Sequence, residues 1–534
     1  MKKIKLFVLA LLLLSGCSNF SKIENTIITK EEVTTPSEII KNLEKESKKD
    51  FENKTLIESL EEKPQEEIEE KSEEVEIEVQ KKDTQVENSI VNEKAKVAIE
   101  NFVNLDMLKY SNVAIDIKDL ESGEIIGSYN EKKVIIPASI MKVITSATAL
   151  EVLGANTKLE TKLLYDGKID DLGVLVGDIY IVGGGDPTLG SDGIKRDPTL
   201  FMKEWIASIK KAGIKKVKGD IIVIDNLFGY VGVEEKWLWE DLGTSYGQGT
   251  YGISIFDNLY TLYLKSDSKK VSIIKTKPKI QNLKFDNRLK ISSKGRKDFS
   301  VRGVPFENKR VLNGEVPANL EKIVTKSDIP NPGLFLGEYL KSSLESSNIH
   351  VNGEVKTSRT TIKKAKNPKT LAITQSVTIE EMVKVLLKRS DNHYTEHLYQ
   401  LLKLEGIDIN EFWKEKGIDT KALVMNDGSG LSRGDYVSAE ILTEILTYMY
   451  KEYPEFVELL PRGGYEGTVI DFLEPNIFSG DVRVKSGSMG GIQSYTGYVE
   501  KDGKKYAFTI IVNHWNGSRN KLKNEMEKLI KSLF

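Results

Sequence analysis

The chain of 534 residues is longer than one hydrophobic core usually serves, so two or more domains are expected. Its composition, with 39% hydrophobic and 29% charged residues, is ordinary for a folded protein and excludes a wholly disordered chain. The formal net charge is −3, which excludes the strong overall basic excess of many nucleic-acid-binding proteins.

The N-terminus has the pattern of a secretion signal. Lys2, Lys3 and Lys5 precede the apolar run 6–14, which is too short to span a bilayer core of about 30 Å. The run ends in Leu-Ser-Gly-Cys, which resembles the lipobox of bacterial lipoproteins, and Cys17 is the only cysteine of the chain. We predict a lipoprotein signal peptide at residues 1–17, lipidation at Cys17, and an extracytoplasmic protein anchored in a bacterial membrane, on its periplasmic or cell-surface side. A plain signal peptide with a chance cysteine is the alternative.

A charged segment follows the signal. Residues 61–80 contain ten glutamates and two lysines, a net charge of −8, and cannot bury enough apolar surface to offset their ordering entropy. We predict a charged, disordered tether at residues 18–95, with a surface helix or coiled coil as the alternative. Removing this −8 from the chain's −3 leaves +5, which is too mildly basic to indicate a nucleic-acid partner.

Strand-like patterns occur at both ends of the remaining sequence. A helical pattern at 98–108 precedes two alternating segments, 112–118 and 124–129, around a Glu-Ser-Gly turn, which predicts a hairpin. Strands at both ends with helices between them favour an α+β fold, in which one sheet contains both termini and helices pack on it. The other expected strands are 482–485, 495–499 and 506–513, and the other expected helices are 379–389, 392–402, 438–450 and 521–533.

The middle of the chain has a different sequence pattern. Between about residues 167 and 326 there are short β-like runs, such as 221–224 and 260–263, frequent Gly and Lys turns, and few long helical patterns. We predict a β-rich insertion at 167–326 within one domain formed by residues 96–166 and 327–534.

One serine and one lysine lie three residues apart in the apolar stretch IIPASIMKVITSATAL. Pro137 suits the first turn of a helix, on which Ser139 and Lys142 share one side. A lysine shielded from water beside a serine hydroxyl can take its proton, and a helix N-terminus favours the resulting alkoxide. The spacing by itself indicates little, because Ser-x-x-Lys recurs at Ser208, Ser266, Ser272 and Ser518.

Two further motifs change this assessment. Ser390-Asp391-Asn392 lies at the break between two helical patterns, and Lys485-Ser486-Gly487 ends a strand. What counts is that all three motifs occur in this order, each in a fitting context: the start of a helix, the loop between two helices and a strand.

At this point the sequence resembles the penicilloyl-serine transferases, the penicillin-binding proteins and serine β-lactamases. Ser139 and Ser390 are 251 residues apart, and Ser390 and Lys485 are 95 apart. The first gap leaves room for a large insertion, as in the type-4, class C low-molecular-mass penicillin-binding proteins, the D-alanyl-D-alanine carboxypeptidase/endopeptidase family. Four more stretches are similar to that family: GDIYIVGGGDPTLG (177–190), WLWEDLGTSYG (237–247), NDGSGLSR (426–433) and GGYEGTV (463–469). The resemblance spans residues 99–534, with Lys-Ser-Gly in place of the commoner Lys-Thr-Gly.

The resemblance implies a transpeptidase-like catalytic domain, with an antiparallel sheet flanked by helices, that acts on peptidoglycan stem peptides through an acyl-enzyme and is inhibited covalently by β-lactams. It implies no cofactor and no metal. Ser139 would be the nucleophile and Lys142 the general base, while Ser390, Asn392 and Lys485 would complete the catalytic set. Ser486, Gly487 and Ser488 would bind substrate, with the backbone N–H groups of Ser139 and Ser488 as the oxyanion hole. We expect Asp427 and Ser429 to shape a turn, and the glycines before Asp186-Pro187 to do the same.

Three alternatives compete with this hypothesis. His393 and His397 fit the His-x-x-Glu-His spacing of a zinc metallopeptidase, although the sequence suggests no third ligand. A β-lactamase or esterase would keep the fold and change the reaction. A wall-binding lipoprotein without catalytic activity would keep only the location.

Overall fold

The computed structural model describes residues 93–534, so the predictions for residues 1–17, for Cys17 and for nearly all of 18–95 lie outside the described range. Among the described residues, none of the helices is both long enough and apolar enough to cross a membrane. The α-helices are α3 (Glu93–Val103), α4 (Lys142–Leu153), α5 (Leu200–Lys211), α6 (Pro332–Ser346), α7 (Ile379–Arg389), α8 (Asn392–Leu404), α9 (Ile409–Glu415), α10 (Ala439–Glu452), α11 (Phe456–Leu459) and α12 (Arg519–Leu533).

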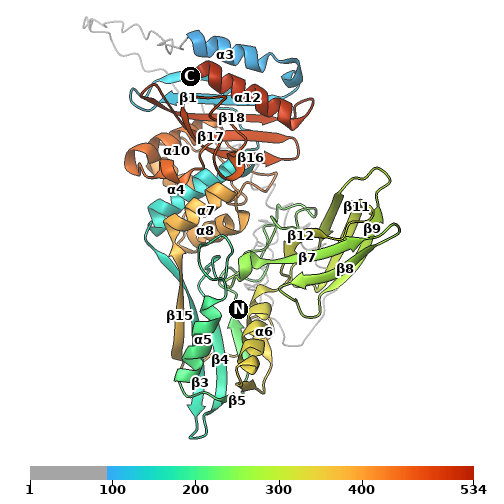
Figure 1. Cartoon of the computed structure of the whole chain (residues 1–534). Coiled ribbons are helices and arrows are strands. Elements are labelled where there is room, and N and C mark those ends of the chain that lie inside the picture. Colours follow the sequence, from blue (N-terminus) through green and yellow to red (C-terminus); the bar gives the residue numbers. More distant parts are fainter. Residues whose placement is uncertain (1–92) are drawn as a thin grey trace, which may run out of the picture. The chain divides into compact units, whose positions relative to one another are not determined.

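A five-stranded antiparallel sheet joins segments from the two ends of the described chain (Figure 1). The strand order is β16-β17-β18-β1-β2, and the central pair runs from Asn112 opposite Asn513 to Asp119 opposite Tyr506. The predicted sheet with strands from both ends is therefore confirmed, as is the hairpin at its edge. The bounds are β1 (Asn112–Asp119), β2 (Ile125–Tyr129), β16 (Asp481–Met489), β17 (Ile492–Lys501) and β18 (Lys504–Asn513).

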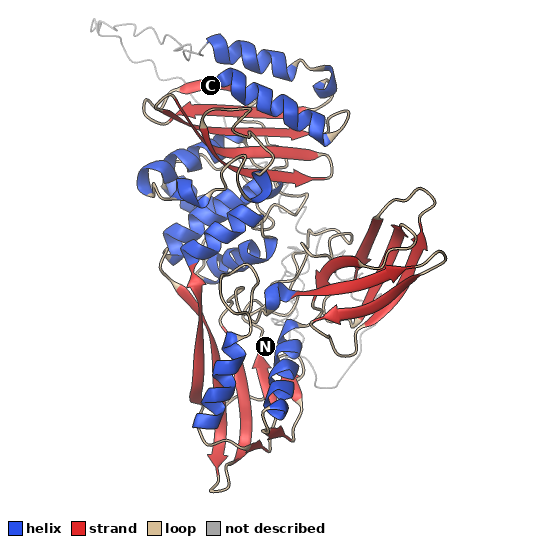
Figure 2. Ribbon diagram, in the orientation of Figure 1, coloured by secondary structure: helices blue, strands red, loops and turns tan. Residues whose placement is uncertain are grey.

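Helices cover both faces of this sheet (Figure 2). Alternate residues of β1 point to opposite faces, as in any strand. Ile115 belongs to the core that α3 and α12 form on one face, whereas Ala114 belongs to the core of α4, α7, α8 and α10 on the other. Each face is thus buried, and the second core contains the helices that carry the candidate site.

A seven-stranded sheet lies between β2 and α7 in the sequence. Its main path is β13-β5-β4-β3-β15, with β6 paired to both β4 and β14. This sheet takes strands from outside the predicted insertion 167–326, because β3 begins at Lys158 and β15 ends at Thr378; the division into domains stays a prediction. The bounds are β3 (Lys158–Ile169), β4 (Val174–Gly183), β5 (Lys216–Val217), β6 (Ile221–Ile224), β13 (His350–Val351), β14 (Val355–Thr357) and β15 (Lys369–Thr378).

Two three-stranded sheets occupy the stretch between β6 and α6. Their strand orders are β12-β7-β8 and β10-β11-β9. Both supply apolar residues, such as Leu262 and Leu312, to the core that they share with the seven-stranded sheet. The bounds are β7 (Leu259–Ser266), β8 (Val271–Lys277), β9 (Lys284–Ile291), β10 (Asp298–Arg302), β11 (Lys309–Val316) and β12 (Ile323–Asp328).

Helix α5 lies within the stretch 167–326, where few long helical patterns were expected, and neither α5 nor α6 was among the predicted helices. Phe201, Trp205 and Ile209 recur every four residues and are buried, which is the spacing of one helical face. The predicted helices at 379–389, 392–402 and 438–450 are confirmed as α7, α8 and α10.

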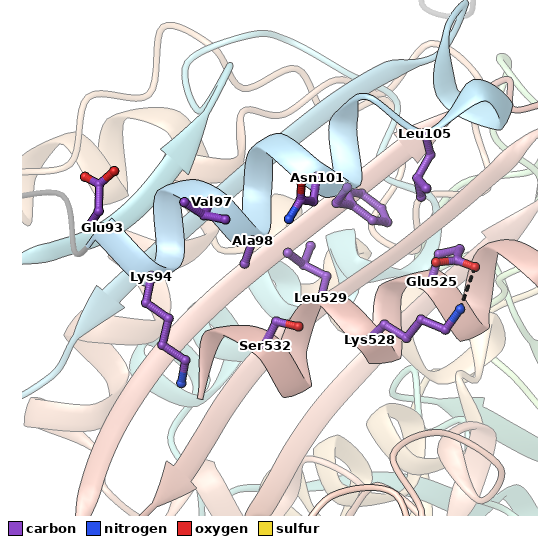
Figure 3. A pocket seen from close by; sticks show the side chains of 11 residues that line it. Glu93, Lys94, Val97, Ala98, Asn101, Leu105, Glu525, Lys528, Leu529 and Ser532 are labelled. Carbon is purple, nitrogen blue, oxygen red and sulfur yellow. Dashed lines mark hydrogen bonds and ion pairs between the residues drawn. The ribbon is translucent and has the colours of Figure 1, made fainter.

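An open pocket of about 570 Å³ lies between α3 and α12, on the outer face of the five-stranded sheet (Figure 3). Val97 and Leu529 are among the apolar residues that line it, and Lys528, another lining residue, forms an ion pair of 2.9 Å with Glu525. The pocket lies on the face of the sheet opposite to α4, so it is separate from the candidate site.

Candidate active site

The segment that carries Ser139 is held in an unusual backbone conformation. Ala138 has a φ of 54°, and a short 3-10 turn, Ala138–Met141, leads directly into α4. The sequence predicted one helix starting near Pro137, and the structure has these two pieces instead. A positive φ in a non-glycine residue costs free energy, and it persists where neighbouring structure enforces it.

Strand β16 packs directly against this segment. A Cβ added at Gly487 would lie 2.7 Å from the carbonyl oxygen of Pro137 and 2.2 Å from Ser494 Oγ, so only glycine allows this approach. Ser494 Oγ also donates a hydrogen bond of 2.6 Å to the Pro137 carbonyl. These contacts fix the distance between the Ser139 turn and the strand that carries Lys485.

Lys142 is fully buried and has three acceptors. Its Nζ lies 3.0 Å from Ser139 Oγ, 2.6 Å from Asn392 Oδ1 and 2.7 Å from the carbonyl oxygen of Ser429. Burial lowers the pKa of Lys142 to about 8, against the opposing attraction of nearby carboxylates, of which Asp427 is the strongest. A lysine with such a pKa is available as a base near neutral pH.

Asn392 is oriented by a contact from the segment 237–247. It is the first residue of α8, and its Nδ2 donates a hydrogen bond of 2.8 Å to the carbonyl oxygen of Tyr246. Because the amide nitrogen faces a carbonyl, the amide oxygen faces Lys142.

The loop that presents the Ser429 carbonyl is held by two buried carboxylates. Glu396 accepts hydrogen bonds from the N–H groups of Gly428 and Ser429, at 3.1 and 2.9 Å. Asp427 accepts bonds from the N–H groups of Ser429, Gly430 and Ser432, as expected for a residue that shapes a turn. Burial raises the pKa of Glu396 well above its usual range, and the neighbouring Asp427 raises it further.

Ser390 and Lys485 form the second pair of the site. Ser390 ends α7 in the left-handed conformation, with φ 55°, and Asp391 caps the N-terminus of α8. Lys485 Nζ lies 2.8 Å from Ser390 Oγ and 2.5 Å from the Ser486 carbonyl oxygen. Burial lowers the pKa of Lys485 well below its usual range, and the charge of Lys142 lowers it further. The five predicted catalytic residues thus form two hydrogen-bonded groups: Lys142 with Ser139 and Asn392, and Lys485 with Ser390.

The three predicted substrate-binding residues of β16 are placed differently from one another. Gly487 contacts the Ser139 turn, as described above. Ser486 Oγ lies 2.7 Å from Thr468 Oγ1, a residue of the GGYEGTV run that the sequence analysis did not single out. The side chain of Ser488 accepts a hydrogen bond from Arg519 of α12 instead of pointing at the lysines.

His393 and His397 are both fully buried in α8, with ring centroids 4.4 Å apart. His397 contacts the His393 carbonyl oxygen through Nδ1, and Ser254 Oγ and the Tyr251 carbonyl oxygen through Nε2. Burial lowers the pKa of His393 to about 3. Within residues 93–534, no group of three or more His, Cys, Asp or Glu side chains is arranged to hold a metal ion.

Fold and site together define an active-serine enzyme of the penicillin-binding protein class. The model of the D-Ala-D-Ala carboxypeptidase 3 (S13) family matches residues 95–533, and the chain belongs to that family. The family match confirms the prediction of a serine D-alanyl-D-alanine carboxypeptidase. The alternatives weighed from the sequence, a β-lactamase or esterase and a zinc metallopeptidase, are not favoured.

Similar proteins agree with this assignment. The chain is 26% identical over 431 residues to a D-alanyl-D-alanine carboxypeptidase of an Actinomadura species, which covers 75% of this chain and 77% of that protein. It is 24% identical over 426 residues to the D-alanyl-D-alanine carboxypeptidase DacB of Haemophilus influenzae, covering 76% and 86%. The crystal structure of penicillin binding protein 4 from Haemophilus influenzae matches with a TM-score of 0.69 and 23% identity, covering 82% of this chain and 98% of that one, which shows the fold.

Proposed function

We propose that Ser139 is the nucleophile of this carboxypeptidase and that Lys142 is its general base. The observation that carries this proposal is the contact of 3.0 Å between the buried Nζ of Lys142 and Ser139 Oγ. With Lys142 neutral, the hydroxyl of Ser139 donates to Nζ, and its proton passes to the amine as the oxygen attacks a carbonyl carbon. The acceptors on Asn392 and Ser429 then hold the ammonium that forms.

The second pair would serve the leaving group and the substrate carboxylate. Ser390 Oγ, bonded to Lys485, would pass a proton to the amine that leaves when the peptide bond breaks. Lys485 and Ser486 would attract and bind the terminal carboxylate, next to Gly487. The backbone N–H groups of Ser139 and Ser488 would hold the oxyanion, a contribution of about 3 kcal/mol for each donor on general precedent.

The substrate would be a peptidoglycan stem peptide that ends in D-alanyl-D-alanine. Attack on the penultimate carbonyl releases D-alanine, and water then frees the acyl-enzyme. A cross-linked stem would release its neighbour in the same way, which is endopeptidase action. A Haemophilus influenzae structure of this fold has been solved in complex with a β-lactam, and we propose that β-lactams acylate Ser139 here as well.

Acylation of Ser139 can be measured by intact-mass spectrometry after treatment with benzylpenicillin. We expect the wild-type chain to gain the mass of one penicilloyl group and Ser139→Ala to gain none, because the alanine has no nucleophilic oxygen. Ser208→Ala is the matched control, since Ser208 begins a Ser-x-x-Lys pattern in α5 and should leave the adduct intact. An adduct that persists in Ser139→Ala, or none in the wild type, would contradict the proposed function.

The rate of acylation should depend on pH through Lys142. Its pKa of about 8 means that the neutral amine, the form that acts as a base, falls about tenfold for each unit of pH below 8. We expect the benzylpenicillin acylation rate to rise from pH 6 to 8 and to level off above that range. Lys142→Arg, which stays protonated, should lose at least about a hundredfold at every pH. A flat wild-type profile would refute the role of Lys142 as base.

The cell-wall substrate implies an extracytoplasmic location. The sequence of the N-terminus supports attachment to the membrane through a lipid anchor on Cys17. This anchor would keep the enzyme at the periplasmic or cell-surface side of a bacterial membrane. We expect mass spectrometry of the mature N-terminal peptide to find diacylglyceryl-modified Cys17, and Cys17→Ser to release the protein from the membrane fraction. A mature chain starting elsewhere, or unmodified at Cys17, would rule the anchor out.

A further inference from the structure

The chain from the start of β7 to the end of β12 is strongly basic. Residues 259–328 contain 17 Lys and Arg against seven Asp and Glu, a net charge of +10, in a chain whose total is −3. The catalytic site draws no residue from this stretch. Its positive charge therefore calls for a separate explanation.

Five of these lysines surround Tyr263 on the outer side of the β12-β7-β8 sheet. Tyr263 lies opposite Lys275 on β8 and opposite Val324 on β12, while Thr261 lies opposite Lys277 and Lys326. Directly paired residues of antiparallel strands point to the same side, so these side chains share one face. We call this surface the Tyr263 face, with the lysines Lys265, Lys275, Lys277, Lys322 and Lys326.

The opposite side of the same sheet is apolar, since Leu262, Leu264 and Ile323 are buried in the core. The Tyr263 face thus turns toward solvent, and its five lysines are exposed. Lys275 and Lys322 place their Nζ atoms 5.4 and 5.9 Å from the centre of the Tyr263 ring. In the described part of the chain, only Lys326 among the five pairs with a carboxylate, that of Asp192 at 3.1 Å.

Four like charges that have no carboxylate partner among residues 93–534 repel one another on one small surface, and a polyanion would relieve this repulsion. Lysine ammonium groups are point charges that suit dispersed carboxylates, whereas fork-shaped arginine side chains suit single bidentate ligands. We propose that the Tyr263 face binds the free carboxylates of peptidoglycan stem peptides, and so holds the polymer while Ser139 acts on one of its stems. This proposal rests on the proposed function, because it takes the substrate polymer as the ligand.

The test is co-sedimentation with purified, insoluble peptidoglycan, in a Ser139→Ala background so that the polymer is not hydrolysed. Changing all five lysines of the Tyr263 face to Gln should weaken binding at least tenfold. The matched control changes five other exposed lysines to Gln, namely Lys504, Lys505, Lys521, Lys528 and Lys531, and should bind like the parent. Equal loss in both variants, or no loss in the first, would overturn the proposal.

Two treatments of the polymer identify the groups that bind. Coupling its carboxylates to a neutral amine should reduce binding of the parent protein to that of the five-lysine variant. Stripping attached phosphate polymers should leave binding unchanged, and a loss at this step would overturn the assignment to stem carboxylates. When Ser139 is restored in the same surface variants, benzylpenicillin should acylate them normally. A missing adduct would therefore show that the proposed function fails, whereas a loss of polymer binding concerns the Tyr263 face alone.

A different set of contacts links the segment 237–247 to Lys142, the proposed base. Trp237 is nearly buried, and its Nε1 donates a hydrogen bond of 2.8 Å to Oδ2 of Asp427. The other oxygen of Asp427 accepts from the N–H of Ser429, whose carbonyl oxygen accepts from Lys142. We infer that Trp237 is a positioning residue for Lys142, acting through Asp427 and the loop 427–432.

The charge of Asp427 opposes the lowering of the Lys142 pKa, together with Glu396, Asp391 and Asp435 on α8 and its neighbouring loops. The hydrogen bond from the Trp237 indole N–H partly neutralises the negative charge of Asp427. Without it, Asp427 should attract the protonated lysine more strongly and raise the pKa of Lys142.

Trp237→Phe removes the N–H and keeps an aromatic ring. We expect the midpoint of the pH profile for benzylpenicillin acylation to move up by at least half a unit, with a rate about threefold lower at pH 7 and equal to wild type at pH 9.5. Trp239→Phe is the control, because Trp239 is 60% exposed, and its midpoint should not move. An unmoved midpoint in Trp237→Phe, or a rate reduced equally at all pH values as a damaged fold would give, would overturn the inference.

Discussion

The burial of Lys142 is the constraint on which the site depends. An ammonium group without water needs acceptors, and here each of the three comes from a different segment: the Ser139 turn, the start of α8 and the loop after Asp427. Moving any of these segments would leave a buried donor or acceptor unpaired. The same desolvation that makes the lysine costly to bury lowers its pKa, so the structural cost and the chemical reactivity have one origin.

A second buried lysine, Lys485, lies close enough to Lys142 to be affected by its charge. Lys485 reaches Ser390 from the edge strand β16, and the charge of Lys142 disfavours its protonated form. Two like charges in one desolvated space suit a catalyst that shuttles single protons, because protonation of one amine disfavours protonation of the other. The carboxylates of Glu396 and Asp427 oppose the lowering of the Lys142 pKa. They accept hydrogen bonds from backbone N–H groups of the loop and not from the Nζ of Lys142.

Much of this arrangement could be predicted from the sequence, because motif order and element type are local properties. The sheet with strands from both ends, α7 and α8 followed from periodicity and turn residues, whereas the choice of Ser139 and Lys142 followed from the order of three motifs and the resemblance to a known family. The contacts of Trp237 with Asp427 and of Tyr246 with Asn392 could not be predicted, since each joins residues far apart in the sequence. The positive φ of Ala138 was also hidden, because alanine carries no signal for it. Helix α5 was missed although its Phe-Trp-Ile spacing was visible.

The pairing of β1 with β18 determines the order in which the protein can assemble. Ser139 belongs to the first third of the chain, but the strand that carries Lys485 is among the last to be made. The reactive serine therefore acquires its partners only when almost the whole polypeptide is present. Until then, the side of β1 that pairs with β18 remains unpaired. A partly synthesised or truncated chain would hold the nucleophile without the machinery that activates it.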